Sequence, residues 1–197
     1  MLFLFVFILQ NIYSCFASIP NFQEGDIVFQ TSNSAQSTVI HLATHSTVSH
    51  CGIVFKENSE WYVLEAVQPV KNTLWENWVK KGKGEKYFVK RLKSTKNLTP
   101  EKLQAMKQFG QQLIGKDYDM GFNWSNERLY CSELVWKIYQ QAIGVELCAL
   151  KQLKNFDLSA PQVVAEMKKR YGNKIPYEEK VVAPVDIFNS KLLESVE

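Results

Sequence analysis

The sequence predicts an α+β fold in which an antiparallel sheet packs against helices. Segments rich in β-branched and aromatic residues fall mainly between residues 25 and 92, whereas helical spacing of apolar residues dominates from residue 99 onward. Strands that come first and helices that come later favour this fold class over a parallel α/β sheet. The length of 197 residues suits one domain with its own core. We expect residues 18–197 to form that single domain.

The N-terminal residues have the pattern of a secretory signal peptide. Met1–Leu9 is an unbroken apolar run, and the small residues that follow it place a cleavage site after Ala17. The run is too short to span a bilayer, so no stable membrane insertion is expected. We therefore predict an exported protein, periplasmic or secreted, from which residues 1–17 are removed. In the less favoured alternative, a lipoprotein, Cys15 carries the lipid, but Tyr13 fits that processing site poorly.

The first strand and the first helix are expected directly after this segment. Gly25–Gln30 is predicted to be a short strand that is entered through a Gly-Asp turn. Residues 34–44 carry apolar residues at helical spacing, with Ser32 or Ser34 as the cap.

A β-hairpin and one further strand follow. Residues 51–55 and 61–67 are rich in β-branched and aromatic residues, and the polar residues 56–60 separate them. Residues 87–92 alternate apolar and charged side chains, which is typical of a strand with one buried face.

Three helices are predicted in the second half of the chain. The first runs from the cap at Thr99 to Gly115, with proline at its first position. The second covers residues 132–142, whose apolar side chains fall on one stripe. The third begins at Ser159, which has capping-box spacing with Gln162, and ends at Gly172.

Composition and charge exclude two classes of protein. Hydrophobic residues make up 46% of the chain and charged residues 22%, which is incompatible with a disordered protein. The net charge is only +3, and the lysines of 80–96 and 151–174 have no aromatic stacking platform beside them. We therefore expect a solvated basic face and no nucleic-acid partner.

Three cysteines remain once the signal peptide is removed. Cys51 and Cys148 could form a disulfide and leave Cys131 free, or all three could be buried thiols. Cys131 immediately precedes the helix of residues 132–142, which Ser132 can cap. The positive end of a helix dipole favours the thiolate form, which is the form that attacks carbonyl groups. Cys131 is therefore the candidate nucleophile, with its own backbone N–H as an oxyanion donor.

A cysteine nucleophile needs a base and a group that orients the base. Of the three histidines, His50 begins the first strand of the hairpin. A turn centred near residues 58–59 places Glu65 opposite Gly52, on the face that His50 shares because side chains alternate along a strand. Glu65 is then a diagonal cross-strand neighbour of His50. A register slip of one residue would place Glu65 on the wrong face.

Two other patterns in the sequence do not predict a binding site. Residues 110–116 have the spacing of a phosphate-binding loop, but Asp117 stands where a Ser or Thr is required. His41, His45, His50 and Cys51 contain histidines at helical spacing, yet no carboxylate lies near that pair in sequence. We expect neither a metal nor another cofactor.

The residues taken together resemble the YiiX-like family, circularly permuted relatives of the NlpC-type papain-like cysteine amide hydrolases. In the permuted branch the histidine and the glutamate precede the cysteine, as they do here. The matching segments are Gly25–Gln30, Leu42–Ser46, Ser49–His50, Glu65–Val67, Tyr118–Asp119, Tyr130–Trp136 and Phe156–Leu158.

The resemblance implies a permuted papain-like fold and a Cys-His-Glu triad of Cys131, His50 and Glu65. It also implies that Tyr118 lies near the oxyanion or the substrate, against the alternative of a core aromatic residue. Two positions depart from the non-permuted members, since Tyr130 replaces a frequent aspartate and Glu133 replaces a small residue. For this reason substrate preference cannot be transferred from the peptidoglycan peptidases.

These features predict an exported cysteine hydrolase that cleaves amide bonds, in peptides or isopeptides of the cell wall, through a thioester. One alternative is a thiol acyltransferase or lipid deacylase on the same site, which requires an apolar acyl channel. The tryptophans could line that channel, although core packing is their expected role: Trp75, Trp78, Trp124 and Trp136. The other alternative is a catalytically silent module that binds wall peptides.

Overall fold

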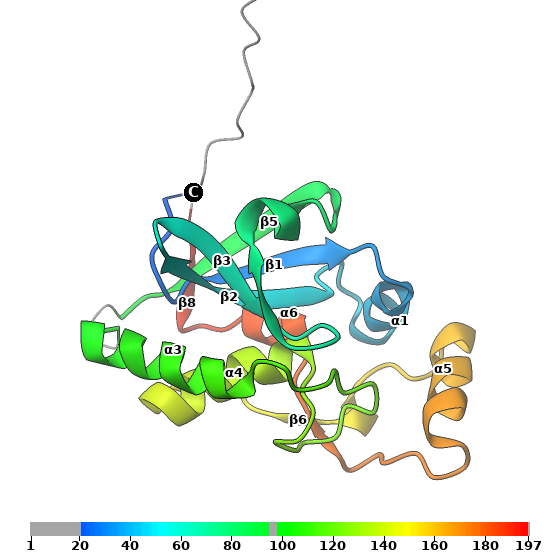
Figure 1. The fold of residues 1–197 in the computed structure, drawn as a ribbon. Coiled ribbons are helices and arrows are strands. Elements are labelled where there is room, and N and C mark those ends of the chain that lie inside the picture. Colours follow the sequence, from blue (N-terminus) through cyan, green and yellow to red (C-terminus); the bar gives the residue numbers. More distant parts are fainter. Residues whose placement is uncertain (1–20, 95–97, 197) are drawn as a thin grey trace, which may run out of the picture.

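The computed structural model describes residues 21–94 and 98–196. Its main feature is a six-stranded antiparallel sheet with the strand order β4-β3-β2-β1-β5-β8 (Figure 1). The strands are β1 Ile27–Ser32, β2 His50–Glu57, β3 Glu60–Glu65, β4 Lys71–Leu74, β5 Gly82–Leu92 and β8 Leu193–Val196. The predicted α+β fold with an antiparallel sheet is confirmed.

Six helices and a small second sheet surround this sheet in the described residues. The helices are α1 Ala35–Thr44, α2 Trp75–Val79, α3 Pro100–Leu113, α4 Cys131–Ile143, α5 Pro161–Tyr171 and α6 Pro184–Phe188. The second sheet pairs β6 Lys151–Gln152 with β7 Lys180–Val181, and the 3₁₀ turn Leu153–Asn155 follows β6.

The hairpin of β2 and β3 has the predicted turn. Asn58 and Ser59 connect the strands with positive φ angles of 49° and 70°, as expected for a tight two-residue hairpin turn. Ile53 pairs with Leu64, so the register is the one that places Glu65 beside Gly52. A Cβ atom on Gly52 would lie 2.4 Å from Val63 Cγ1, so the close approach of the two strands here requires glycine.

The two faces of the sheet are both covered. Ile53 and Leu64 belong to the larger core, beneath α3 and α4, whereas Val54 and Val63 belong to a second core that includes Trp78 of α2. Because side chains alternate along a strand, the central strands are buried on both sides. Figure 1 shows α3 and α4 together along one face of the sheet.

Helix α4 is the most buried helix and begins one residue earlier than expected. Its first nine residues, 131–139, are all buried. Tyr130 is the N-cap, and its backbone N–H donates to the Glu133 carboxylate at 3.4 Å. The predicted cap at Ser132 is wrong: the Ser132 hydroxyl donates to the Val182 carbonyl at 2.7 Å, because the segment directly after β7 offers it an acceptor.

Of the caps predicted for two other helices, α3 and α5, one is confirmed and one is wrong. Thr99 caps α3 by accepting from the backbone N–H of Lys102, as expected. The capping box at Ser159 is wrong, since Ala160 is the N-cap of α5 and the Ser159 hydroxyl donates to Asp157 at 2.6 Å. A nearby carboxylate competes successfully for a serine hydroxyl.

Helices α1 and α5 contact each other beyond one end of the sheet, with a third apolar cluster between them (Figure 1). This cluster includes Val163 and Met167 of α5 together with Leu153. Within residues 21–94 and 98–196, no helix has the length and apolar character needed to cross a bilayer. The predicted signal peptide of residues 1–17, with Cys15, lies outside the described residues.

Candidate active site

Cys131 is the first residue of α4 and only 2% of its surface is exposed. The helix has 13 residues, so its N-terminus presents backbone N–H groups and the positive end of a substantial dipole. Helix α4 packs directly against β2. This packing brings the thiol to the start of β2, where His50 lies.

His50 is held by Glu65 across the hairpin. The imidazole Nε2 and the Glu65 carboxylate Oε2 are 2.6 Å apart, and both side chains are buried. The structure therefore brings together the two residues that the hairpin register placed side by side. With Nε2 bonded to the carboxylate, Nδ1 is the ring nitrogen left to face the Cys131 thiol. Such a bond fixes the tautomer and the ring orientation of a histidine.

The second carboxylate oxygen of Glu65 has two further partners. Thr73 of β4 donates its hydroxyl at 2.6 Å, and the Lys81 ammonium donates at 3.0 Å. Burial alone would raise the pKa of Glu65. The hydrogen bond and the charge of His50, together with the hydrogen bonds from Thr73 and Lys81, outweigh burial and lower this pKa to about 2. Sequence reasoning missed Thr73, because the four-residue strand β4 carries no alternation signal. It also missed Lys81, which lies in the turn between α2 and β5.

The electrostatics of His50 and Cys131 favour an ion pair. Burial alone would lower the pKa of His50, but the hydrogen bonds with Cys131 and Glu65 outweigh it and raise this pKa to about 10. The pKa of the Cys131 thiol is lowered well below its usual value, chiefly by a hydrogen bond from the neighbouring Cys51 thiol and also by His50. Burial raises the pKa of Cys51. A thiolate at Cys131 beside an imidazolium at His50 is the resulting state.

Tyr118 stands close to this pair. Its hydroxyl accepts a hydrogen bond from Gln36 Nε2 at 3.1 Å, and its backbone N–H donates to Gln68 Oε1 at 2.7 Å. Burial raises the pKa of the phenol, and the neighbouring charge of Cys131 raises it further. The tyrosine therefore stays a neutral hydrogen-bonding group beside the thiol.

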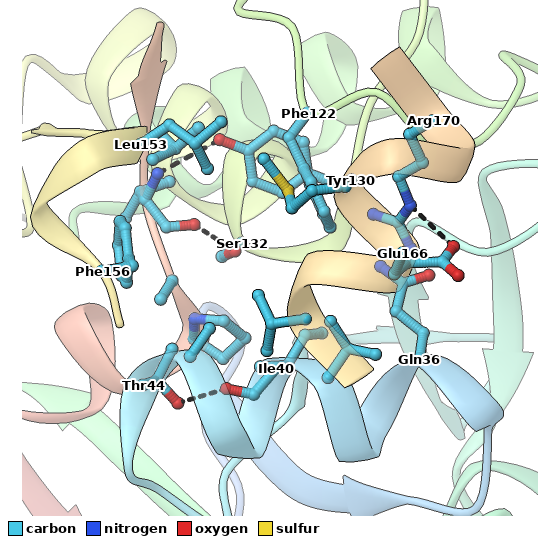
Figure 2. Close-up of a pocket in the computed structure, with 18 of the residues that line it drawn as sticks. Gln36, Ile40, Thr44, Phe122, Tyr130, Ser132, Leu153, Phe156, Glu166 and Arg170 are labelled. Atoms are coloured by element: carbon cyan, nitrogen blue, oxygen red, sulfur yellow. Dashed lines mark hydrogen bonds and ion pairs between the residues drawn. The ribbon is translucent and has the colours of Figure 1, made fainter. Parts of the chain in front are cut away.

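Two cavities meet at this point of the molecule. One lies between α1 and α5 (Figure 2) and encloses about 710 Å³ of empty space, part of which is open to solvent. Cys131 is among the residues that line it. The other is lined by His50, Glu65 and Lys81 and encloses about 1040 Å³, part of which is also open to solvent. Gln36, Ile40 and Tyr118 line both. We call them the apolar cavity, which Cys131 lines, and the His50 cavity, which His50 lines.

The remaining histidines and cysteines lie elsewhere or have other partners. His41 Nδ1 is 3.0 Å from the Ser46 carbonyl, and His45 Nε2 is 3.0 Å from Asp157. Among residues 21–94 and 98–196, no three His, Cys, Asp or Glu side chains are grouped to hold a metal ion. Of the cysteine arrangements left open above, the structure has Cys51, Cys131 and Cys148 all as free thiols.

Comparisons with known proteins agree with this fold. A family model described as a permuted papain-like amidase enzyme, YaeF/YiiX, C92 family, matches residues 21–197. The chain is 46% identical over 189 residues to the uncharacterized protein YiiX of Escherichia coli strain K12, which covers 94% of this chain and 93% of that protein. A crystal structure described as metalloprotein YiiX from Escherichia coli O157:H7 matches with a TM-score of 0.84 and 46% identity, over 89% of this chain and 96% of that one.

The predicted resemblance to YiiX-like proteins is confirmed, and so is the permuted papain-like fold. Both the family match and the similar structure cover most of the chain. The protein therefore belongs to the YaeF/YiiX, or C92, family of permuted papain-like amidases.

Proposed function

We propose that this protein is a cysteine hydrolase that cleaves amide bonds, with Cys131 as nucleophile, His50 as base and acid, and Glu65 as the group that orients His50. The observation that carries the proposal is the buried 2.6 Å bond between His50 and Glu65, located beside a thiol at a helix N-terminus. Membership of an amidase family supports the same reaction class.

The proposed reaction has two halves. The Cys131 thiolate attacks the carbonyl carbon, and the backbone N–H of Cys131 and the Tyr118 hydroxyl donate to the oxyanion. His50 gives its proton to the departing amine as the C–N bond breaks, which leaves a thioester on Sγ. His50 then takes a proton from water, the hydroxide attacks the thioester, and the acid is released with the thiol restored.

The relative described as a metalloprotein raises the question of a metal. In the described part of the structure, the side chains that could act as metal ligands do not fit such a centre. His50 Nε2 is bonded to Glu65, His45 Nε2 is paired with Asp157, and no three potential ligands are grouped together. No step of the proposed reaction is therefore assigned to a metal ion.

The substrate and the compartment are further parts of the proposal. Export through residues 1–17 brings the enzyme to cell-wall peptides, where an amide of the γ-glutamyl type is the expected bond. The second candidate, deacylation or acyl transfer on the same site, is favoured by one observation: Cys131 lines an apolar cavity. The mass of the mature protein after expression tests the cleavage after Ala17.

Alkylation by iodoacetamide, followed by mass spectrometry between pH 4 and pH 10, tests the triad. We expect rapid modification of Cys131 near pH 6 in the wild type and a shift of the titration to higher pH in His50→Ala. Cys148→Ala, which removes a thiol outside the site, should leave the Cys131 profile unchanged. A Cys131 thiol that titrates like free cysteine, with no change in His50→Ala, would refute the proposal and favour a silent binding module.

A further inference from the structure

Gln30 of β1 lies beside His50 in the central part of the sheet. The two residues are direct partners in the pairing of β1 with β2. Opposite residues of antiparallel strands project to the same face, with Cβ atoms about 4.5–5.5 Å apart. Both side chains line the His50 cavity. The Gln30 amide is therefore a neighbour of the imidazole that acts as base in the proposed reaction.

The amide of Gln30 is buried and has no partner within the described part of the chain. Only 1% of the residue is exposed, and neither Oε1 nor Nε2 makes a hydrogen bond to another described residue. Unsatisfied buried amides are rare in native proteins, and each one requires an explanation. Because this amide lines a cavity that is partly open to solvent, a molecule in that cavity can be its partner.

Other polar side chains around His50 already have partners. The Ser49 hydroxyl is 2.7 Å from another serine hydroxyl, and Thr73 and Lys81 both donate to the Glu65 carboxylate. These groups support the imidazole or the strands. The amide beside His50 has a donor and an acceptor that neither of these tasks uses.

Gly82, the first residue of β5, leaves the space that this amide occupies. A Cβ atom at position 82 would clash with Gln30 Oε1 and would lie 3.3 Å from the Lys86 carbonyl oxygen. Any side chain at position 82 would therefore displace the amide. The close approach of the β5 backbone confines the amide to one place in the cavity wall.

We infer that the Gln30 amide positions the water molecule that hydrolyses the Cys131 thioester. The inference rests on the proposed function and adds a positioning residue to its second half. The water enters on the side from which the amine has left, because His50 exchanges a proton with both. One proton of the water goes to His50 Nδ1, and its other O–H donates to Gln30 Oε1. This second bond fixes the direction from which the oxygen approaches the thioester carbon.

The step is balanced with one water molecule and no other reactant. The new C–O bond forms, the C–Sγ bond breaks, and the acid departs with the oxygen and one hydrogen of the water. His50 keeps the other proton, so the Cys131 thiolate and the His50 imidazolium are restored. A protein that holds water in this place favours hydrolysis over transfer to another acceptor, which would have to displace that water.

Acetylation of the enzyme by p-nitrophenyl acetate tests the inference without knowledge of the physiological substrate. Release of nitrophenolate reports acylation, and intact mass spectrometry of quenched samples follows the decay of the acetyl-enzyme, with Cys131→Ala as the blank. Gln30→Met removes the amide and nearly keeps the shape of the side chain. We expect it to slow deacylation about tenfold to a hundredfold and to change acylation by less than about threefold. Gln104→Met, at an exposed position of α3, should keep both wild-type rates.

Gly82→Ala tests the same role with the glutamine still present. Its methyl group meets mainly the end of the Gln30 side chain, so the fold should tolerate the change while the amide is displaced. We expect a selective loss of deacylation here too. The double variant Gly82→Ala/Gln30→Met should be no slower than Gln30→Met alone, because both changes act on one group. Losses that multiply in the double variant would overturn the inference.

An added nucleophile distinguishes the positioning of water from general damage to the site. Hydroxylamine attacks the thioester from solution and needs no partner at Gln30. In Gln30→Met the ratio of acetohydroxamate to acetate should rise at least about tenfold above the wild-type ratio. The pH dependence of deacylation, which reports His50, should keep its wild-type shape. An unchanged product ratio would show that the variant slows every attack on the thioester, and would overturn the inference.

Thermal unfolding tests the alternative that Gln30 only supports the fold. A buried methionine needs no hydrogen-bond partner, so Gln30→Met should melt at or above the wild-type temperature. A melting temperature several degrees lower, with acylation and deacylation slowed alike, would show a structural role and overturn the inference.

The same measurements separate this inference from the proposed function. If the wild type forms no acetyl-enzyme at Cys131, the proposed hydrolase is refuted, and the inference falls with it. If the acetyl-enzyme forms and decays as fast in Gln30→Met as in the wild type, only the role of Gln30 is refuted. Slower acylation with unchanged deacylation would place Gln30 in substrate recognition, and would also overturn the inference.

Discussion

The pKa values of two buried glutamates near Cys131 are shifted in opposite directions. Glu65 at the end of β3 and Glu133 in the first turn of α4 are both 0% exposed. The pKa of Glu65 falls to about 2, whereas burial raises the pKa of Glu133 to about 7 despite its ion pair with Lys137 at 2.7 Å. Burial is common to both regions, so the difference comes from their hydrogen-bond donors.

The donors explain the two roles. Glu65 receives short bonds of 2.6 Å from His50 and from Thr73, and one of 3.0 Å from Lys81. Beside its ion pair, Glu133 receives a bond of 3.4 Å from the N-cap backbone. A carboxylate with several close hydrogen-bond donors remains charged and can orient an imidazole. A carboxylate with fewer donors, such as Glu133, serves to cap a helix.

The largest contrast is expected in activity. Glu65→Gln removes the charge that stabilises the His50 imidazolium, and we expect kcat/KM for the amide substrate to fall on the order of a thousandfold. Glu133→Gln keeps the capping acceptor and should reduce kcat/KM by less than about tenfold. Glu127→Gln, at an exposed position, controls for the substitution itself. Equal losses in the two buried variants would show that Glu65 has no special role.

The second contrast concerns stability against pH. Between pH 4.5 and about 7 the folded state keeps a proton on Glu133 that the unfolded state releases, so the free energy of unfolding falls as pH rises through this window. The loss is on the order of 3 kcal/mol. Glu133→Gln should flatten this part of the curve, as measured by urea unfolding from pH 4 to pH 8.

Glu65 contributes with the opposite sign. Its pKa is lowered from 4.5 to about 2, so its stabilisation is present above pH 4.5 and is lost as pH falls through 2. The difference in unfolding free energy between wild type and Glu65→Gln should therefore shrink below pH 4.5. A difference that stays constant over this acidic range would contradict the assignment.

A smaller effect is expected from one donor to Glu65. Thr73→Val keeps the shape of the side chain and removes its hydroxyl bond to the carboxylate. Hydrogen bonds to charged groups contribute roughly 1.5–3 kcal/mol, so we expect destabilisation of that order in urea unfolding and a loss of kcat/KM below about tenfold. Thr38→Val, at an exposed position of α1, should change neither.

The sequence predicted the parts of this site that local patterns encode. Strand alternation and the turn at residues 58–59 located His50 and Glu65 on one face, and the helix pattern located Cys131 at a helix N-terminus. Thr73 was missed because β4 has only four residues, too few for a periodic signal, and Lys81 because it lies in the turn between α2 and β5. A tertiary contact brings them to Glu65.

The cavities were beyond sequence reasoning for a related reason. The apolar cavity forms where α1 meets α5, which are separated by more than 100 residues in the chain. The spacing of Val163 and Met167 predicts only that they lie on the buried face of a helix. The same spacing is expected whether that face packs in a core or lines a cavity. The caps at Ser132 and Ser159 failed because tertiary partners took their hydroxyls.

The smallest expected effect concerns Cys51, the thiol beside Cys131. Cys51 donates to Cys131 and helps to lower the pKa of that thiol, so Cys51→Ala should raise this pKa and slow iodoacetamide alkylation at pH 6 by about threefold to tenfold. Cys148→Ala removes a thiol of comparable chemistry outside the site and should leave the rate unchanged. His50 and the helix dipole remain in Cys51→Ala, so the titration should still lie below that of free cysteine. If alkylation at pH 6 stays as fast as in the wild type, His50 and the helix alone hold the thiolate, and Cys51 is a packing residue.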